Sequence, residues 1–411
     1  MNSRERIRAT LDHRQPDKVA IDFNGHRSSG IAVQAYKKLR EYLGLKPDKL
    51  YVYDYIQQLA LVEDDVLDII GADVVELGHD CDKIADYWQD WELQDGTPCK
   101  IPAFIKVEKT DQGDIVQGDE GQVICIQKPG CLYVEQTYFP IADQDDESFE
   151  KLPYYLDQIM WAKLGTAPAP AGFDEAGLGV WRTTAQKLRL SSDRAIYGIF
   201  GGSIVEMGNY CFRMDNFLYE LAANPKRVHR FLDKLTEFHL KNLTQYLGAV
   251  GTDIDVIGFS DDLGMQMGPM ISPEMYREFF KPRHKILWEH AKRISPNIKI
   301  GLHCCGGIYP LLGDLIEAGL EVINPVQFIS KDMELSRLKR EFGKDLVFWG
   351  GGCDTREILP YGTPEQIKKH VQENISIMNV GGGFVFQQVH NIMANVPPEN
   401  IMAMFEAVRE A

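Results

Sequence analysis

An α/β fold with a closed ring of parallel strands is what this 411-residue sequence predicts. Short β-prone apolar runs alternate with helix-period segments, and this alternation is typical of right-handed βαβ units in a parallel sheet. The number of units is the second observation, because eight of them close into a single (β/α)8, or TIM, barrel. The predicted strands cover residues 19–23, 73–77, 195–200, 255–259, 298–303, 321–325, 346–349 and 384–389. We therefore expect the chemistry at the carboxyl ends of these strands, where barrel enzymes carry their active sites.

Helix start signals separate the predicted strands. Asn224 is an expected N-cap with Pro225 at the first helical position, and Ser272 with Pro273 repeats the pattern. Both pairs use residues that favour the beginning of a helix, so each supports a crossover helix between two strands. The predicted helices cover residues 225–247, 309–318, 364–378 and 398–409, and another begins at 273.

One region departs from the βα alternation. Between residues 81 and 142, short β-prone runs are separated by turn pairs such as Asp95-Gly96 and Gln112-Gly113. These pairs indicate antiparallel hairpins. We interpret the region as a β-meander inserted between the second and third barrel strands, where it covers the barrel mouth. The expected organisation is one domain over residues 1–411, with 81–142 as the inserted hairpin region.

Composition and charge exclude several classes of protein. The formal net charge of −16 argues against a general nucleic-acid binder, which needs a basic surface. The first residues lack the apolar run of a signal peptide, and no stretch approaches the roughly 20 apolar residues of a membrane helix. Eight cysteines without framework spacing indicate a reducing compartment. We therefore expect a cytoplasmic protein that does not act at a membrane.

A metal site is predicted from one histidine and two cysteines. His303 and Cys305 are separated by one residue at a strand end, so both side chains project from the same face. Cys353 follows Gly350-Gly351-Gly352 at the end of a later strand. One imidazole and two thiolates suit zinc and leave a fourth position open, as in catalytic sites. The alternative is that these cysteines only pack in the core, the role that we assign to Cys304.

Polar residues at two more strand ends are candidate catalytic groups. Asp261 and Asp262 follow an apolar strand, where they would orient a histidine, bind a cation or complete the metal shell. Capping of the following turn is the structural alternative. His390 and Gln388 share a face of the last strand by the two-residue period, and the histidine would act as acid, base or hydrogen-bond donor. A purely structural histidine is the alternative there.

The ends of the first two strands hold candidate substrate-binding groups. Arg27 is placed to bind a carboxylate through two parallel hydrogen bonds. Its neighbours His26 and Asn24 would assist. Glu76 and His79 lie at the end of the second strand, and Gln266 lies in the loop after Asp261-Asp262 as a weaker candidate.

Taken together, these segments resemble the uroporphyrinogen decarboxylase superfamily, and more particularly its methyltransferase branch. The resemblance extends over nearly the whole chain and implies a (β/α)8 barrel. It is carried by Gln15-Pro16-Asp17-Lys18-Val19-Ala20-Ile21-Asp22-Phe23, Asp261-Asp262-Leu263-Gly264, Ile271-Ser272-Pro273-Glu274-Met275-Tyr276, Gly382-Gly383-Phe384-Val385-Phe386, Val389-His390-Asn391-Ile392 and Val396-Pro397-Pro398-Glu399-Asn400.

The resemblance extends to the metal residues but is divided between two branches. Methylcobalamin:coenzyme M methyltransferases hold zinc with a His-x-Cys pair and a later cysteine, a pattern that His303, Cys305 and Cys353 match. Uroporphyrinogen decarboxylases need no metal and carry an arginine-rich first strand end, where this chain has Arg27 alone. His390 matches a histidine that decarboxylases keep near the C-terminus. The methyltransferase branch is therefore the better match.

The resemblance implies a zinc-dependent methyltransferase that moves a methyl group between a small thiol, ether or amine and a corrinoid. The expected cofactors are Zn²⁺ and a corrinoid, as methylcobalamin, supplied by a partner protein, because no separate cobalamin-binding domain is evident. Family resemblance also favours a homodimer. Two alternatives stay open: a metal-free decarboxylase of a carboxylated substrate, and a noncatalytic corrinoid- or tetrapyrrole-binding protein.

Overall fold

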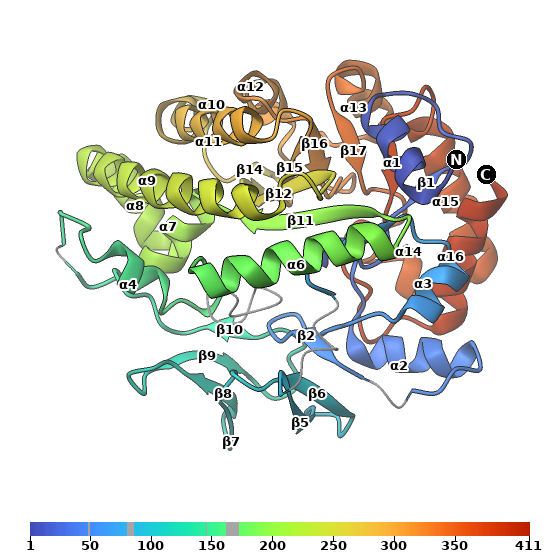
Figure 1. Cartoon of the computed structure of the whole chain (residues 1–411), viewed down its shortest axis with the longest axis horizontal. Helices are drawn as coiled ribbons and strands as arrows, with labels where there is room; N and C mark the ends of the chain where they lie inside the picture. The colour runs from blue at the N-terminus through green and yellow to red at the C-terminus, as the bar shows by residue number, and fades with distance from the viewer. Residues whose placement is uncertain (48–49, 80–85, 145, 162–171) are drawn as a thin grey trace.

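Parallel strands form a nearly closed barrel, as the sequence predicts (Figure 1). A computed structural model describes every residue except 48–49, 80–85, 145 and 162–171. In this described part, eight strands pair in the order β1-β18-β17-β16-β15-β12-β11-β4, and each predicted strand has its counterpart. Their bounds are β1 Ala20–Ile21, β4 Val74–Glu76, β11 Ala195–Gly201, β12 Val256–Ser260, β15 Lys299–His303, β16 Val322–Asn324, β17 Val347–Trp349 and β18 Phe384–Phe386.

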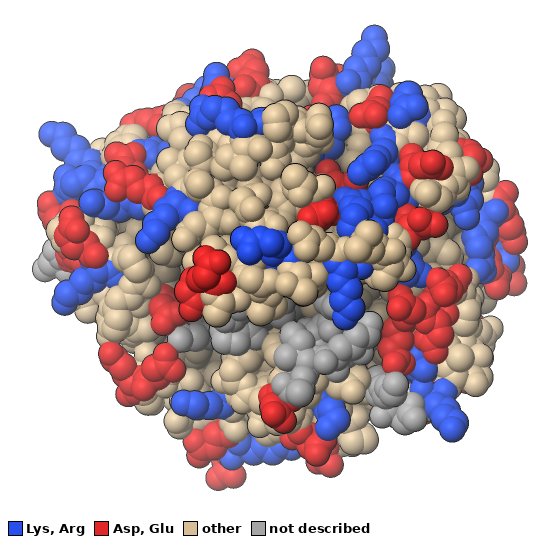
Figure 2. All heavy atoms as spheres, in the orientation of Figure 1, with Lys and Arg blue, Asp and Glu red and all other residues tan. Residues whose placement is uncertain are grey.

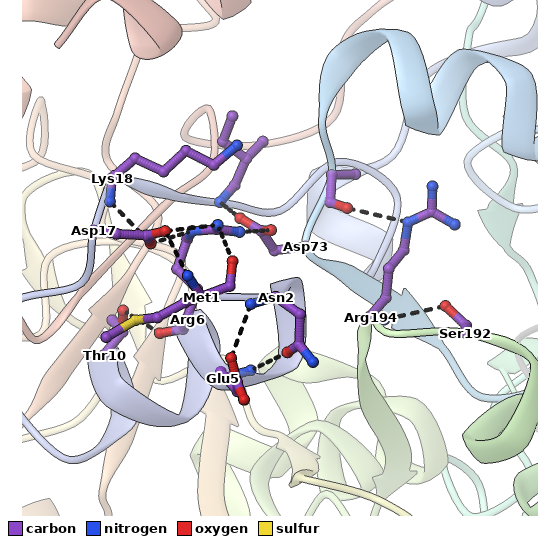
Figure 3. Close-up of polar contacts among 12 residues, drawn as sticks. Met1, Asn2, Glu5, Arg6, Thr10, Asp17, Lys18, Asp73, Ser192 and Arg194 are labelled. Atoms are coloured by element: carbon purple, nitrogen blue, oxygen red, sulfur yellow. Dashed lines mark hydrogen bonds and ion pairs between the residues drawn. The ribbon is translucent and has the colours of Figure 1, made fainter.

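Backbone and side chain of Asp73 close the ring between β1 and β4. The amide N–H of Asp73 donates to the carbonyl of Ile21 at 2.8 Å, and its Oδ2 accepts from the Ile21 N–H at 2.9 Å. Arg6, from helix α1 (Ser3–Leu11), pairs with Asp73 and also with Asp17, which holds the N-terminal ammonium of Met1 (Figure 3). This network ties α1 across the seam of the barrel.

Side chains fill the barrel from its N-terminal end. Ile7 and Leu11 of α1 enter that end and pack against a buried cluster inside the ring. Tyr197 and Trp349 belong to the same cluster, with their ring centres 5.4 Å apart. The other members are small or branched, namely Ala20, Val74, Ala195, Val256, Val322, Val347 and Val385. The interior is therefore a packed core below the strand ends, as in other barrels of this type.

Helices surround the barrel, and the predicted starts agree with the structure. The Ser272 side chain accepts from the Met275 N–H at the start of α10, and Pro225 begins α9. The helix predicted to begin at residue 273 is interrupted, because a five-residue π-helical segment separates α10 from α11. Pro282 has no N–H to donate back into the preceding turn, which accounts for the interruption. The bounds are α2 Val33–Tyr42, α3 Asp64–Ile70, α4 Leu152–Leu156, α6 Glu175–Ser191, α7 Val205–Phe212, α8 Met214–Ala223, α9 Pro225–Val250, α10 Pro273–Met275, α11 Lys281–Ile294, α12 Leu312–Ala318, α13 Leu335–Phe342, α14 Ile358–Tyr361, α15 Pro364–Met378 and α16 Pro398–Glu410.

The insertion between β4 and β11 contains the expected antiparallel strands. Gly96 and Gly113, with φ of +82° and +133°, stand at two of the predicted turns. Residues 81–85 of the predicted insertion lie outside the described part of the chain. Its strands form a pair, β5 Trp88–Glu92 with β6 Pro98–Pro102, and a sheet of β7 Val107–Thr110, β8 Gly113–Gln117, β9 Val123–Gln127 and β10 Glu135–Gln136. Figure 1 places them on the opposite side of the barrel from α11 and α12.

Two further hairpins were not predicted from the sequence. One joins β2 (Val52–Asp54) to β3 (Leu59–Ala60) before α3, and the other joins β13 (Gly264–Met265) to β14 (Gly268–Pro269) directly after β12. Acidic and basic side chains are interspersed on the face drawn in Figure 2. Within the described residues, none of the helices has the length and apolar character needed to cross a bilayer.

Candidate metal and catalytic site

Three side chains of metal-binding type meet at the carboxyl end of the barrel. His303 is the last residue of β15, Cys305 follows two positions later, and His390 lies beyond the end of β18. The Sγ atom of Cys305 is 3.4 Å from Nε2 of His303, and the two histidine ring centres are 5.9 Å apart. One nitrogen or sulfur atom from each of the three residues lies within 4.8 Å of the others.

Two glycines allow the chain to turn beside Cys305. Gly306 has a φ of +87°, and a Cβ atom at this position would lie 2.3 Å from the carbonyl carbon of Gly264. A Cβ atom at Gly264 would lie 2.4 Å from the carbonyl oxygen of Cys305. Side chains cannot occupy such distances, so a larger residue at either glycine would separate the two loops and displace Cys305.

Asn324 determines which nitrogen of His303 is free. Its Nδ2 donates to the carbonyl of Trp349 at 3.0 Å and to Oε1 of Gln387 at 2.8 Å, so its Oδ1 faces His303. The Oδ1 atom is 2.8 Å from Nδ1 of His303, which must therefore carry a proton and donate it. The tautomer assigned in this way leaves a lone pair on Nε2, directed toward Cys305. The imidazole is thus oriented to bind a cation.

The imidazole of His26 packs against that of His303. The two rings stack with centres 5.2 Å apart, and His26 is 5% exposed. Its Nδ1 accepts from the Ser28 N–H at 3.1 Å, while the Ser28 hydroxyl donates to Oδ1 of Asn324 at 2.8 Å. Burial lowers the pKa of His26, and the nearby His303 acts in the same direction. The structure therefore places His26, a predicted substrate-binding residue, as a neutral ring under His303.

Cys353 does not join the group that its spacing predicted. The thiol is fully buried, packs in the apolar core and lies 3.8 Å from the carbonyl oxygen of Asp354. Among the described residues, the third side chain that meets His303 and Cys305 is His390. The sequence could not rank these two, because both follow strand ends and only the loop geometry decides which turns inward. The assignment of Cys353 as a metal ligand stays a prediction.

Burial determines the protonation of the group. It raises the pKa of the Cys305 thiol, and the negative charge of Asp262 adds to that effect. Burial also lowers the pKa of His390 to about 3, with a smaller contribution from His303. At neutral pH the group therefore holds a thiol and a neutral imidazole on His390. A bound divalent cation would reverse the shift at sulfur and release the thiol proton.

The two consecutive aspartates have different surroundings. Asp261 is fully buried and accepts from the backbone N–H groups of Ile204, Val205 and Glu206 at 2.8 to 3.1 Å. Its Oδ2 is also 2.9 Å from Nε2 of His284. Each of its oxygens is thus used to fix the start of α7. These contacts cap a helix rather than the following turn and also orient His284, and the catalytic role of Asp261 stays a prediction.

Asp262 faces the metal-type group instead. Its Oδ1 accepts from the Cys305 N–H at 2.7 Å and lies 4.0 Å from Nε2 of His303. The side chain is 37% exposed, so solvent or substrate reaches it. Asp262 therefore positions the Cys305 backbone and remains available for contact with a ligand.

Glu206 is a residue of this site that the sequence analysis missed. Tyr210 donates its hydroxyl to Oε1 at 2.7 Å, while Ser260 and Ser203 approach Oε2 at 2.7 and 3.3 Å. Burial, together with the charges of Asp262 and then Asp261, raises the pKa of Glu206 to about 8. An acidic residue in the first turn of a helix is ordinary, so its position in the sequence carries no signal.

The predicted residues at the first two strand ends form a second polar cluster. Nδ2 of Asn24 is 3.4 Å from Nδ1 of His79, whose Nε2 is 3.3 Å from Oε2 of Glu76. Arg27 approaches Asp54 at 3.9 Å. Several polar atoms here are buried without a hydrogen-bond partner in the described structure: Oδ1 of Asn24, Nε of Arg27, Oε2 of Glu76 and Nε2 of His79. Such atoms are costly unless a ligand or water satisfies them.

Gln388 and Gln266 are the remaining residues of the predicted substrate-binding group. Strand β18 ends at Phe386, so the alternation that predicted a common face for Gln388 and His390 stops before either residue. Gln388 is fully buried, and neither of its side-chain polar atoms has a hydrogen-bond partner among the described residues. Gln266 lies at the exposed tip between β13 and β14, where its Oε1 accepts from Arg356 at 3.2 Å.

Comparison with known proteins gives a consistent family. The family model for uroporphyrinogen decarboxylase (URO-D) matches residues 161–411, more than half of the chain. A methylated-thiol–coenzyme M methyltransferase of Methanosarcina mazei is 27% identical over 198 residues, which is 48% of each chain. A uroporphyrinogen decarboxylase of Chlorobaculum tepidum is 24% identical over 271 residues, covering 65% of this chain and 67% of that protein. The match to the methyltransferase thus spans about half of its length.

A solved structure has the same fold over the full length. A methyltransferase from Methanosarcina mazei superposes with a TM-score of 0.60 at 18% identity, covering 100% of this chain and 99% of that one. The fold, the family model and the sequence relatives agree with one another. This chain therefore belongs to the uroporphyrinogen decarboxylase family, and its relatives support a place in the methyltransferase branch of the superfamily.

Proposed function

We propose that the chain is a zinc-dependent methyltransferase that moves a methyl group between a small thiol, ether or amine and the corrinoid of a partner protein. The observation that carries this proposal is the meeting of His303, Cys305 and His390 at the barrel mouth. The family and its methyltransferase relative support the same class of reaction.

The donor set fits zinc. Tetrahedral zinc with Zn–N and Zn–S bonds of about 2.0–2.3 Å keeps its ligand atoms roughly 3.3–3.7 Å apart. The 3.4 Å between Nε2 of His303 and Sγ of Cys305 agrees with that separation. Zinc held here would supply Lewis acidity, or a lowered pKa for a substrate thiol. His390 would be the third ligand, and Cys353 is the alternative from the sequence pattern.

The protein residues around the group would orient ligand and substrate. Asn324 fixes the His303 tautomer, and Asp262 fixes the Cys305 backbone. Arg27 and Glu76, whose buried atoms lie near Asp54 and His79 but make no hydrogen bond, would bind charged or polar groups of the substrate, with Gln388 as a further contact. Satisfying buried polar atoms in this way favours a bound substrate over an empty mouth.

Exposed apolar side chains on strand-end loops support docking of a partner over the mouth. Met267 is 77% exposed on the β13–β14 hairpin, and Tyr361, the last residue of α14, is 73% exposed. Met265 and Ile329, at 54% and 39%, lie on loops of the same barrel end. Exposed apolar side chains on these loops would contribute to a protein-binding surface. A corrinoid carried by a partner protein would reach the site from this side.

Methyl transfer to cobalt is the direct test of the proposed function. Zinc-loaded protein should methylate free Co(I) cobalamin from at least one donor among methyl thioethers, aryl methyl ethers and methylamines, or move methyl from methylcobalamin to a thiol. The corrinoid absorbance spectrum follows the reaction, and chelation should abolish it until zinc is restored. Metal-independent release of CO₂ from a carboxylated substrate, without methyl transfer, would instead establish a decarboxylase. Corrinoid binding without turnover would establish a noncatalytic binding protein.

Replacing Asn324 with alanine should weaken zinc binding about 10- to 100-fold, because ligand-orienting partners contribute that much. The substitution removes the Oδ1 acceptor that keeps the Nδ1 proton of His303 in place. Competition with a chromophoric chelator measures the zinc affinity directly. Asn379→Ala, at the residue that caps the C-terminal end of α15, is the matched control. Equal affinity in wild type and Asn324→Ala would show that the tautomer is fixed by other means.

A further inference from the structure

Glu206 carries a carboxyl group that does not cap its own helix. Its backbone N–H is already bonded to Asp261, so the carboxyl group is not needed as a helix cap. The carboxyl contacts only hydroxyl groups among the hydrogen-bond partners that the structure describes, those of Tyr210, Ser260 and Ser203. Within the same residues, none of its contacts is an ion pair with a lysine or arginine. A carboxyl in such surroundings retains its proton more readily than one paired with a cation.

Ser260 connects this carboxyl to the mouth of the barrel. Ser260 is the register partner of His303 across β12 and β15. Register partners on adjacent strands project from the same face of the sheet, so the side chains of Ser260 and His303 point to the same side. Glu206 is therefore one hydrogen bond away from a group that faces the reaction site. A hydroxyl can accept a proton on one side while it donates its own on the other.

The charges around Glu206 favour the protonated form. Three carboxyl groups gather here, and Asp261 is fixed by three backbone N–H groups and His284. Asp262 accepts from the Cys305 N–H. Negative charge on these two neighbours and burial both raise the pKa of Glu206. The titratable groups that face Glu206 from the adjoining elements are Asp261, Asp262, Tyr210, Cys304 and Cys305.

We propose that Glu206, through the hydroxyl of Ser260, is the proton source for the leaving group of the methyl donor. The site accordingly takes donors whose leaving atom needs a proton, namely the oxygen of an ether or the nitrogen of an amine. This inference rests on the proposed methyl transfer and selects among its three donor classes.

The step balances with a Co(I) corrinoid as the methyl acceptor. The carbon–oxygen bond of the donor breaks, and its electron pair stays on oxygen. The Ser260 hydroxyl gives its proton to that oxygen and takes the proton of Glu206, leaving an alcohol and a carboxylate. A carbon–cobalt bond forms with two electrons from cobalt, which passes from Co(I) to Co(III). Solvent then returns a proton to Glu206.

Substitution of Glu206 with glutamine should slow demethylation of ethers selectively. General acids contribute about 10²- to 10⁴-fold, so we expect at least a 10²-fold loss in kcat with substituted aryl methyl ethers of high leaving-group pKa. Trimethylsulfonium, which leaves as neutral dimethyl sulfide, should lose less than about threefold, since no proton is needed. Ser260→Ala should reproduce the pattern, and Glu206→Asp should restore part of the rate. Glu237→Gln, at a site 71% exposed on α9, is the control.

Two readouts separate this inference from the proposed function. Wild-type kcat for ethers should fall as the pH rises through about 8, because Glu206 then loses its proton, whereas kcat for the sulfonium donor should not. Independently of turnover, infrared spectra at pH 7 should contain a protonated carboxyl band that Glu206→Gln removes. An absent band, or equal losses with both donor types, overturns the inference. Absence of methyl transfer from every donor in the wild type, with the band present, overturns the proposed function instead.

Discussion

Cys305→Ser should abolish stoichiometric zinc binding and, with it, most of the methyl transfer activity. The serine hydroxyl is a far weaker zinc ligand than a thiolate, and Cys305 supplies the only sulfur within reach of His303 in the described structure. Lewis-acid stabilisation by a bound metal is worth several kcal/mol, so turnover should fall on the order of 10³-fold. Metal analysis of protein purified without added zinc, followed by reconstitution, gives the stoichiometry. Cys131→Ser, at a partly exposed free cysteine, should leave zinc content unchanged.

The same measurement decides between His390 and Cys353. If the arrangement in this structure holds, His390→Ala loses zinc while Cys353→Ser keeps it, because the Cys353 thiol is buried away from the group. The reverse result would show that the loop after β17 rearranges when zinc binds, as the sequence pattern predicts. Retention of about one zinc per chain by Cys305→Ser, with the metal bound elsewhere, would contradict the site altogether.

The barrel was predictable because its signals are local. Each strand is a short apolar run, and helix starts such as Asn224-Pro225 and Ser272-Pro273 use residues with strong positional preferences. The π-helical segment before Pro282 and the hairpin after β12 were not predicted. The hairpin depends on how one loop meets another, which neither periodicity nor propensity records, whereas the π-helical segment follows from the missing N–H of Pro282, a signal that the sequence analysis did not use.

The candidate site was predictable only in part, for a related reason. His303 and Cys305 are only two positions apart in the chain, so they stay close together even though β15 ends at His303. His390 joins them from 85 positions away through a loop beyond β18, where alternation no longer applies. Asn324 and Glu206 act through hydrogen bonds between different strand ends, so the sequence lists them only as ordinary polar residues. The sequence thus identifies the types of residue in the site. Which of them contact one another is determined only by the folded barrel.

Asp261→Ala should destabilise the protein by about 3–5 kcal/mol, the loss expected when one partner of a buried charged network is removed. The substitution leaves the N–H groups of Ile204, Val205 and Glu206 without acceptors at the start of α7. It also leaves His284 without its partner at 2.9 Å in a buried position. Each unsatisfied buried group adds its own desolvation penalty, and together these penalties account for a loss of this size in the free energy of unfolding.

Urea unfolding measures this loss and also tests the role that the sequence suggested for Asp261. A structural role requires a lower midpoint with an unchanged slope, and Asp261→Asn should recover part of the stability because its amide oxygen still accepts from α7. Asp262→Ala is the matched control, since its side chain is 37% exposed and its loss should cost little stability. An Asp261→Ala protein with wild-type stability but no activity would contradict the structural role and restore the catalytic one. The distinction matters for the reaction: if Asp261 holds α7 in place, it also holds Glu206 against Ser260, and the two residues then act on catalysis through one helix start.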